Sequence, residues 1–123
     1  MTVQEVLEGA HHSAAELSAG ELTAELQAVL GQKLVAFALG DRHPKTIGRY
    51  ARGERPPDDQ THRRLVDLRT IVGVLETGMR RQAVKSWMLG ANPHLRSRAP
   101  IEVFHDGRTS DVMRAAQQFV VAR

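Results

Sequence analysis

The sequence contains no cysteine and only five aromatic residues among its 123 residues. Without cysteine the chain can form no disulfide, no zinc-thiolate or iron-sulfur site and no thiol nucleophile. It also lacks an apolar run approaching the roughly 20 residues that a bilayer span requires. Its N-terminus has neither the basic start nor the continuous apolar stretch of a secretory signal. These absences predict a cytoplasmic protein in a reducing compartment, with no membrane partner.

Positive charge is missing from one end of the chain. Residues 1–30 contain five Glu and no Lys or Arg. The remainder carries seventeen Lys and Arg against nine Asp and Glu, a net charge of +8. A polyanion should therefore be repelled by the N-terminal end and attracted by the rest of the chain.

Residue patterns typical of catalysis or metal binding are also missing. The six histidines show neither HxxxH nor HExxH spacing, and the side chains of the adjacent His11 and His12 would diverge on a helix. There is no Gly-rich phosphate loop, and no Ser, His and carboxylate stand in a recognisable nucleophile context. We therefore expect no enzymatic activity, no cofactor and no metal site.

Apolar residues recur at helical spacing along most of the chain. No segment alternates apolar and polar residues long enough for a strand, so the sequence predicts an all-α fold. A helix capped by Ser18 should end at Gly31, and a dense, largely buried helix should follow it and end at Gly40. The first 19 residues have a weaker apolar face and are expected to form a loosely held helix.

Prolines, glycines and capping residues delimit the helices of the C-terminal half. Asp58 or Asp59 should cap a long helix that ends at Gly78. Asn92 and Pro93 favour a turn between two helices. Three further helices are expected: one with Ala83, Val84, Trp87 and Met88 on its buried face, one turn started by Pro100, and a closing helix capped by Thr109 or Ser110.

The segment HPKTIGRYARGERPP, residues 43–57, predicts a short helix rich in positive charge. Pro44 suits its first turn, with Asp41 or His43 as a cap, and Gly53 stops it. Ile47 and Tyr50, three residues apart, should face the core and leave the remaining arc free to enter the major groove of DNA. The expected DNA-binding residues are Arg42, His43, Lys45, Thr46, Arg49, Arg52 and Arg55.

These side chains suit different parts of DNA. Arg can bond a guanine edge with two donors, Thr can bond a base or a phosphate, and Lys45 with the flanking Arg42 and Arg55 suits phosphates. The alternative is a solvated connector, since charge runs on helix surfaces usually contact only water. The clustering of cations on one helix, behind a dense apolar helix that can brace it, favours a helix-turn-helix that binds DNA.

Two stretches carry a resemblance to a known family. LVAFALGDRHPKTIGRYARGERPP, residues 34–57, resembles the Xre-type helix-turn-helix in its Leu-Gly, Thr-Ile-x-Arg-aromatic and Gly-x-x-x-Pro elements. SWMLGANPHLRSRAPIEVFHDGRTSDVMRAAQQFV, residues 86–120, is similar to the toxin-binding region of Xre/MbcA/ParS-type antitoxins, with its Trp-containing helix, Asn-Pro-x-Leu turn, Pro-led helix and closing amphipathic helix. The Gly-Gly that often follows this turn in the family is replaced here by Arg96-Ser97-Arg98. The turn from Gly40 to Thr46 is one residue longer than the commonest spacing.

The resemblance implies the antitoxin of a type II toxin-antitoxin system. Its partner would be a RES-domain toxin that degrades NAD, whose NAD pocket the C-terminal segment of the antitoxin would cover, while the N-terminal module represses the shared operon. The residues expected to bind the toxin are Met113, Gln117, Phe119, Val120, Val121, Ala122 and Arg123. Otherwise the chain would be a protein-interaction module, or a simple helix-turn-helix repressor without a toxin partner.

The same resemblance implies three regions. Residues 1–19 would be an N-terminal extension, residues 20–57 an Xre-like helix-turn-helix that binds operator DNA, and residues 58–123 a helical toxin-binding domain. One short helix makes few base contacts, so we expect a homodimer that reads paired half-sites.

Overall fold

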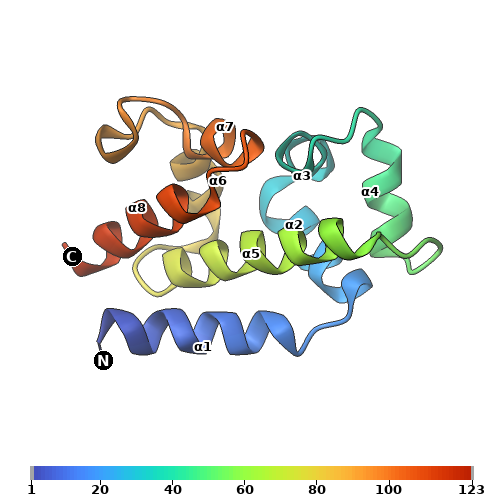
Figure 1. The fold of residues 1–123 in the computed structure, drawn as a ribbon, viewed down its shortest axis with the longest axis horizontal. Coiled ribbons are helices and arrows are strands. Elements are labelled where there is room, and N and C mark those ends of the chain that lie inside the picture. The colour runs from blue at the N-terminus through green and yellow to red at the C-terminus, as the bar shows by residue number, and fades with distance from the viewer. Residues whose placement is uncertain (1, 123) are drawn as a thin grey trace.

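The computed structural model describes residues 2–122, which form α-helices and one 3₁₀ turn and contain no strand (Figure 1). The all-α prediction is therefore confirmed. The elements are α1 (Val3–Ala15), α2 (Ala19–Leu30), α3 (Gln32–Leu39), α4 (Pro44–Ala51), α5 (Asp59–Glu76), α6 (Arg81–Leu89), η1 (Pro93–Leu95), α7 (Pro100–His105) and α8 (Thr109–Val121).

Helix α5, the longest at 18 residues, passes through the middle of the molecule. Helices α2 to α4 gather around one of its ends and α6 to α8 around the other (Figure 1). Leu65, Leu68, Ile71 and Leu75 are fully buried on α5 and belong to one apolar core that includes both groups of helices. The two ends of the fold thus share one core, which continues across the expected boundary at residue 58.

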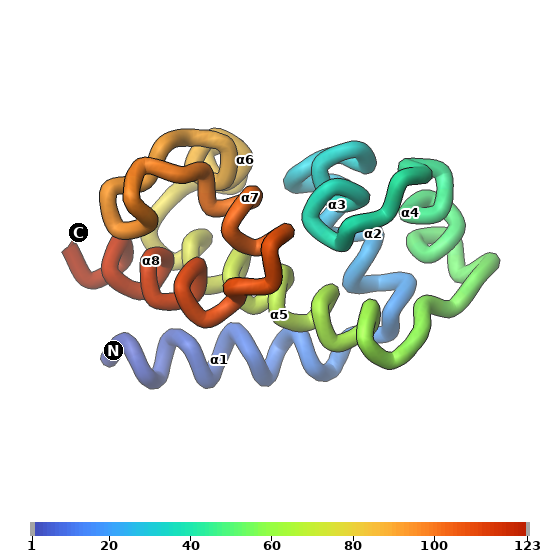
Figure 2. Tube along the Cα trace, turned by 45° about the horizontal axis from the view of Figure 1, so that its top comes forward, coloured from blue at the N-terminus to red at the C-terminus, as the bar shows by residue number. Residues whose placement is uncertain are grey.

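Helix α1 packs closely along α5 and also touches α8 (Figure 2). Ala14 is buried, and a Cβ added to Gly73 of α5 would lie only 3.1 Å from the Cβ of Ala10. Thr2 and Glu5 form a capping box at the start of the helix. The expectation of a loosely held helix is therefore wrong, because small residues let the two backbones approach where the apolar stripe of α1 looked weak.

Glycine turns arrange α2, α3 and α4 around one another. Gly31, at φ 87°, ends α2 and begins α3, which is bent from α2 by 116°. Gly40, in the left-handed conformation at φ 75°, ends α3, and Asp41 then accepts a hydrogen bond from the backbone N–H of His43 at 2.8 Å. His43 occupies the N-cap position of α4 without capping it through its side chain.

In the part of the chain described, no single helix is long and apolar enough to cross a membrane. The bent pair of α2 and α3 together reaches the length and composition of a membrane span.

Several local expectations need correction. Phe37 on α3 is 41% exposed and stacks on the ring of His105, so α3 is less buried than its composition suggests. Ala83 on α6 is exposed, since only Val84 and Met88 of that helix point fully into the core. The N-cap of α8 is Arg108 instead of Thr109 or Ser110, because the helix already begins at Thr109; Arg108 follows Gly107, whose φ is 89°.

Candidate nucleic-acid interface, C-terminal segment and arginine pocket

One face of α4 is fixed against α2 and α3. Ile47 is fully buried and Tyr50 is 8% exposed, which confirms the prediction that both face the core. A Cβ on Gly20 of α2 would lie 3.3 Å from the backbone oxygen of Tyr50, so the two helices are in close contact there. Burial raises the pKa of the Tyr50 hydroxyl. The helix is thus held rigidly from behind.

The opposite face of α4 is exposed and cationic. Lys45, Arg49 and Arg52 follow one another at intervals of four and three residues, which places them on one side of the helix. All three are exposed. No ion pair within residues 2–122 involves Lys45 or Arg49. The flanking residues expected to contact DNA are exposed as well, namely Arg42, His43 and Arg55.

One cation of this face has an acidic neighbour. Arg52 bonds Glu54 at 2.9 Å, and both side chains are more than half exposed. The hydrogen bond raises the pKa of Arg52 and lowers that of Glu54. An exposed pair of this kind is weak and is screened by salt. Arg52 therefore contributes less free positive charge than Arg49 unless a stronger anion displaces Glu54.

Thr46 does not lie on the exposed arc. It is only 8% exposed, so the expectation that its side chain is free to reach a base is wrong. Thr46 lies four residues before Tyr50, and residues four apart share one face of a helix. Tyr50 faces the core, and Thr46 is buried beside it.

The residues expected to contact a toxin do not all lie on one side of α8. Met113 and Gln117 line a groove that α8 makes with α1 and α5. Phe119 packs edge-on against Trp87 of α6, with ring centroids 6.5 Å apart. Val120 and Val121 lie near Val3 and Val6 at the start of α1 and near Thr77, the C-cap of α5.

Exposure also differs along the end of α8. Phe119 and Val120 are partly buried against the core, with Trp87 of α6 beside Phe119 and Val3 and Val6 of α1 near Val120. Val121 is 60% exposed and Ala122 is exposed. Arg123, the last residue expected at a toxin, lies outside the described residues.

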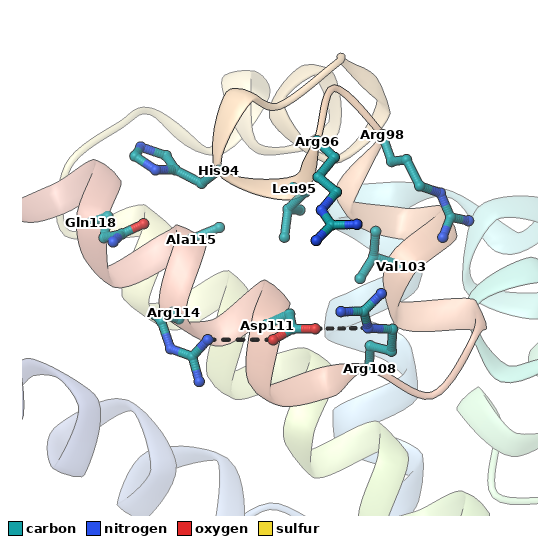
Figure 3. A pocket seen from close by; sticks show the side chains of 10 residues that line it. All are labelled: His94, Leu95, Arg96, Arg98, Val103, Arg108, Asp111, Arg114, Ala115 and Gln118. Carbon is teal, nitrogen blue, oxygen red and sulfur yellow. Dashed lines mark hydrogen bonds and ion pairs between the residues drawn. The ribbon is translucent and has the colours of Figure 1, made fainter.

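A second concentration of arginine, which the sequence did not lead us to expect as a site, surrounds a pocket of about 140 Å³ between η1, α7 and α8 (Figure 3). We call it the arginine pocket. Asp111 accepts from Nε of Arg108 at 2.7 Å and lies 3.4 Å from Nη1 of Arg114. The lining residues are His94, Leu95, Arg96, Arg98, Val103, Arg108, Asp111, Arg114, Ala115 and Gln118. The signal in the sequence that could have pointed to it is the basic run Arg96-Ser97-Arg98 directly after the Asn-Pro turn.

The loop that carries Arg96 is held by Asn92, which is 7% exposed. The Asn92 side chain accepts from the N–H of His94 at 2.9 Å, and its backbone oxygen accepts from the N–H of Ser97 at 2.8 Å. Its own N–H donates to the Arg98 oxygen at 3.1 Å. Arg96 and Ser97 both adopt left-handed backbone, at φ 56° and 65°. The predicted Asn-Pro turn is confirmed, and it places two residues other than glycine where glycine would be unstrained.

Metal ligands do not cluster in the described chain. No group of three or more His, Asp or Glu between residues 2 and 122 could hold a metal ion. His12 pairs instead with Glu16 at 2.9 Å on the exposed side of α1.

Comparison of the chain with protein-family models, with curated proteins and with solved structures found no match. The candidate sites are therefore defined by their own geometry.

Proposed function

We propose that this protein binds double-stranded DNA through α4 and acts as the antitoxin of a toxin-antitoxin pair. One observation carries the DNA-binding part. Lys45, Arg49 and Arg52 share the exposed face of a short helix whose other face is buried. The major groove of DNA is roughly 12 Å wide and admits an α-helix presented in this way. Arg49, at the centre of the face, would donate two hydrogen bonds to a guanine edge.

The residues that flank α4 would bind the DNA backbone. Arg42 precedes the helix and Arg55 follows it, so their charges suit phosphates on either side of the groove. The acidic start of α1 lies at the other end of the molecule from α4 (Figure 1). Its repulsion of DNA would favour the approach of the α4 end first.

The DNA-bound form would be a homodimer. A single helix of eight residues reads few base pairs, and two copies on half-sites one helical turn apart would multiply the contacts. This arrangement suits repression of an operon, because occupancy of a paired site is specific as well as tight.

The antitoxin part of the proposal depends on the resemblance of residues 86–120 to the toxin-binding region of Xre/MbcA/ParS-type antitoxins. A RES-domain toxin would receive the C-terminal end of α8 in its NAD pocket. The exposure of Val121 and Ala122 supports this, since these side chains are available without unfolding the core. Phe119 and Val120 would instead keep the end of α8 in place through their contacts with α6 and α1.

The DNA-binding part is tested by fluorescence anisotropy on duplex DNA from upstream of the protein's own coding sequence. We expect binding that weakens steeply with salt, and weaker binding by Arg49→Ala. Arg81→Ala is the matched control, because Arg81 is an exposed arginine at the start of α6, away from α4. A protein that shows no salt-dependent binding would be a protein-interaction module instead.

The antitoxin part is tested separately by coexpression with the product of the adjacent reading frame. Deleting residues 121–123 should abolish protection of the cells and leave the melting temperature unchanged, because the described part of this segment is exposed. The Gln82→Ala variant, altered at an exposed position of α6, should protect as the wild type does. Protection by the shortened chain would refute the role of the C-terminal end.

A further inference from the structure

We propose that the arginine pocket binds a phosphate dianion, either inorganic phosphate or the terminal phosphate of a small phosphomonoester. The pocket is formed by η1, α7 and α8. These elements belong to the group of helices around the end of α5 away from α4 (Figure 1). The pocket takes no part in the proposed DNA contact. It lies within residues 86–120, the region proposed to meet the toxin, but its lining does not include Val121 or Ala122, so phosphate binding can be tested without a toxin.

The charges around the pocket leave an excess of positive charge. Its lining includes Arg96, Arg98, Arg108 and Arg114 but only one acid, Asp111. One further acid, Asp106, pairs with Arg98 at 2.8 Å. Four guanidinium groups against two carboxylates leave a net charge of +2. A ligand with two negative charges would balance it.

Two of these arginines point toward the same space. Arg96 extends from the loop after η1, and Arg108 extends toward it from the start of α8, with Asp111 beside them (Figure 3). Within residues 2–122, Arg96 forms no ion pair or hydrogen bond through its side chain. Two like-charged groups that face a shared space repel each other unless an anion lies between them. Their arrangement suits a ligand that accepts hydrogen bonds from both.

Asp111 orients the arginines without occupying all their donors. Its Oδ2 accepts a hydrogen bond from Nε of Arg108, and its Oδ1 accepts one from Nη1 of Arg114. Both Nη nitrogens of Arg108 remain available, and paired guanidinium nitrogens match the spacing of phosphate oxygens. Asp111 is thus a positioning residue.

The size and walls of the pocket select a compact ligand. Its volume of about 140 Å³ is below the ~300 Å³ at which pockets for drug-sized molecules begin. Leu95, Val103 and Ala115 contribute apolar wall and are themselves buried. Charge-assisted hydrogen bonds are stronger beside such surfaces than in open water. A phosphate group fits this volume, whereas a nucleobase or a second ring would have to remain outside.

The backbone fixes Arg96 before any ligand arrives. Arg96 has a positive φ of 56°, a conformation that L-residues rarely adopt, and the hydrogen bonds to Asn92 hold the loop in it. Strained backbone of this kind persists where the surrounding structure enforces it. The backbone that carries Arg96 therefore needs no ordering on binding, which favours affinity.

Isothermal titration calorimetry at pH 8 and constant ionic strength tests the proposal on the full chain. Inorganic phosphate and glycerol 3-phosphate are the two dianionic probes, dimethyl phosphate is the monoanionic probe, and chloride is the reference. We expect both dianions to bind and dimethyl phosphate to bind much more weakly. Arg96→Ala and Arg108→Ala should each weaken binding roughly tenfold or more, since a hydrogen bond to a charged group is lost. Arg108→Lys should recover part of the loss, because it keeps the charge but not the paired donors.

The matched control is Arg81→Ala, which removes one exposed arginine outside the pocket and should leave phosphate affinity unchanged. Circular dichroism of each variant confirms that it folds. Phosphate that binds no better than chloride would overturn the proposal, and so would Arg96→Ala and Arg108→Ala proteins that are folded and bind as the wild type does. Preference for dimethyl phosphate would also overturn it, since that result would indicate a phosphodiester site. Loss of DNA binding by Arg49→Ala with intact phosphate binding would separate the two proposals.

Discussion

The molecule has two arginine-rich regions, and they differ in shape. On α4 the cations lie on a convex helix face, and among the described residues only Glu54 forms an ion pair with one of them, Arg52. In the arginine pocket the cations surround a hollow, where Asp111 holds two of them. A convex row of charge suits a long polyanion that offers one phosphate after another. A concave cluster suits a single compact anion, so shape rather than charge separates the two proposed ligands.

The backbones of the two regions differ in the same sense. The turns around α3 and α4 place glycines at their positive φ positions, Gly31, Gly40 and Gly53. The pocket loop places Arg96 and Ser97 there instead. The turns near α4 are therefore unstrained, whereas the pocket loop is strained at the residue that directs its arginine inward.

Arg49→Ala has the largest expected effect. If this variant bound DNA as the wild type does, the proposed difference between the α4 face and the arginine pocket would be wrong. Loss of a bidentate contact to a base should weaken binding to the specific DNA by about 1–3 kcal/mol and relax sequence preference at one position. Anisotropy titrations on specific and scrambled duplexes measure both. Arg96→Ala should bind DNA as the wild type does, because its side chain lies in the arginine pocket. Equal losses in the two variants would mean that the protein attracts DNA through its overall charge.

Asn92→Ala tests whether the loop of the arginine pocket, unlike the turns around α4, depends on a buried side chain to hold its shape. The change removes the acceptor of the part-buried hydrogen bond from the His94 N–H, and loss of such a bond lowers the unfolding free energy by about 0.5–1.5 kcal/mol. Urea unfolding measures the loss, with Gln82→Ala on the exposed side of α6 as the neutral control. Phosphate affinity should fall in parallel, since Arg96 would lose its fixed position. An unchanged midpoint would show that Asn92 does not hold the loop.

Local periodicity was enough to place α4 and its buried face. Pro44 and Gly53 delimited the helix, and the spacing of Ile47 and Tyr50 identified the side that packs. The same spacing predicts that Thr46, four residues before Tyr50 on the same short helix, is buried, which contradicts the expectation that Thr46 faces DNA.

The arginine pocket and the docking of α1 could not be found in this way. The pocket depends on where the loop after η1 meets the start of α8, and the spacing of residues along a single helix does not predict that contact. The contact of α1 with α5 depends on Ala10 and Gly73, 63 positions apart in sequence, whose small size matters only when the helices meet. Sequence patterns identify faces of single helices, but tertiary packing decides which faces meet.

Ser97→Gly tests the strain in the pocket loop directly. Glycine adopts a φ of 65° without penalty, so the substitution should raise the unfolding free energy by about 1 kcal/mol, less the greater entropy of glycine in the unfolded chain. Gly40→Ala is the opposite test in the α4 region and should lower it by a similar amount, since it forces alanine to a φ of 75°. Thermal and urea unfolding report both. Destabilisation by Ser97→Gly would mean that the loop is not strained.

Arg55→Ala should have a smaller effect, visible chiefly in salt dependence. Arg55 is exposed beyond α4 and is expected to contact a phosphate. Its loss should weaken binding to all duplexes alike and should reduce the steepness of log affinity against log salt concentration by about 1. Titrations at several salt concentrations give the slope. Loss of sequence preference in this variant would assign Arg55 to a base contact instead.

Asp67→Asn has the smallest expected effect and concerns an acid that, unlike Asp111, no arginine holds. The neighbouring Arg64 directs its guanidinium to the ring and backbone oxygen of Phe104, at 4.7 Å from the ring centroid. Burial raises the pKa of the Asp67 carboxyl above its ordinary 3.8, and the nearby His11 and Arg64 oppose this less strongly. The folded protein therefore holds this proton more tightly than the unfolded chain, and stability falls as the pH rises from 3.8 through the raised pKa. Asparagine removes that loss, so the variant should melt up to about 3 °C higher at pH 7, with the difference vanishing below pH 3.8. A lower melting temperature at pH 7 would show that Arg64 and His11 stabilise the carboxylate more than burial destabilises it.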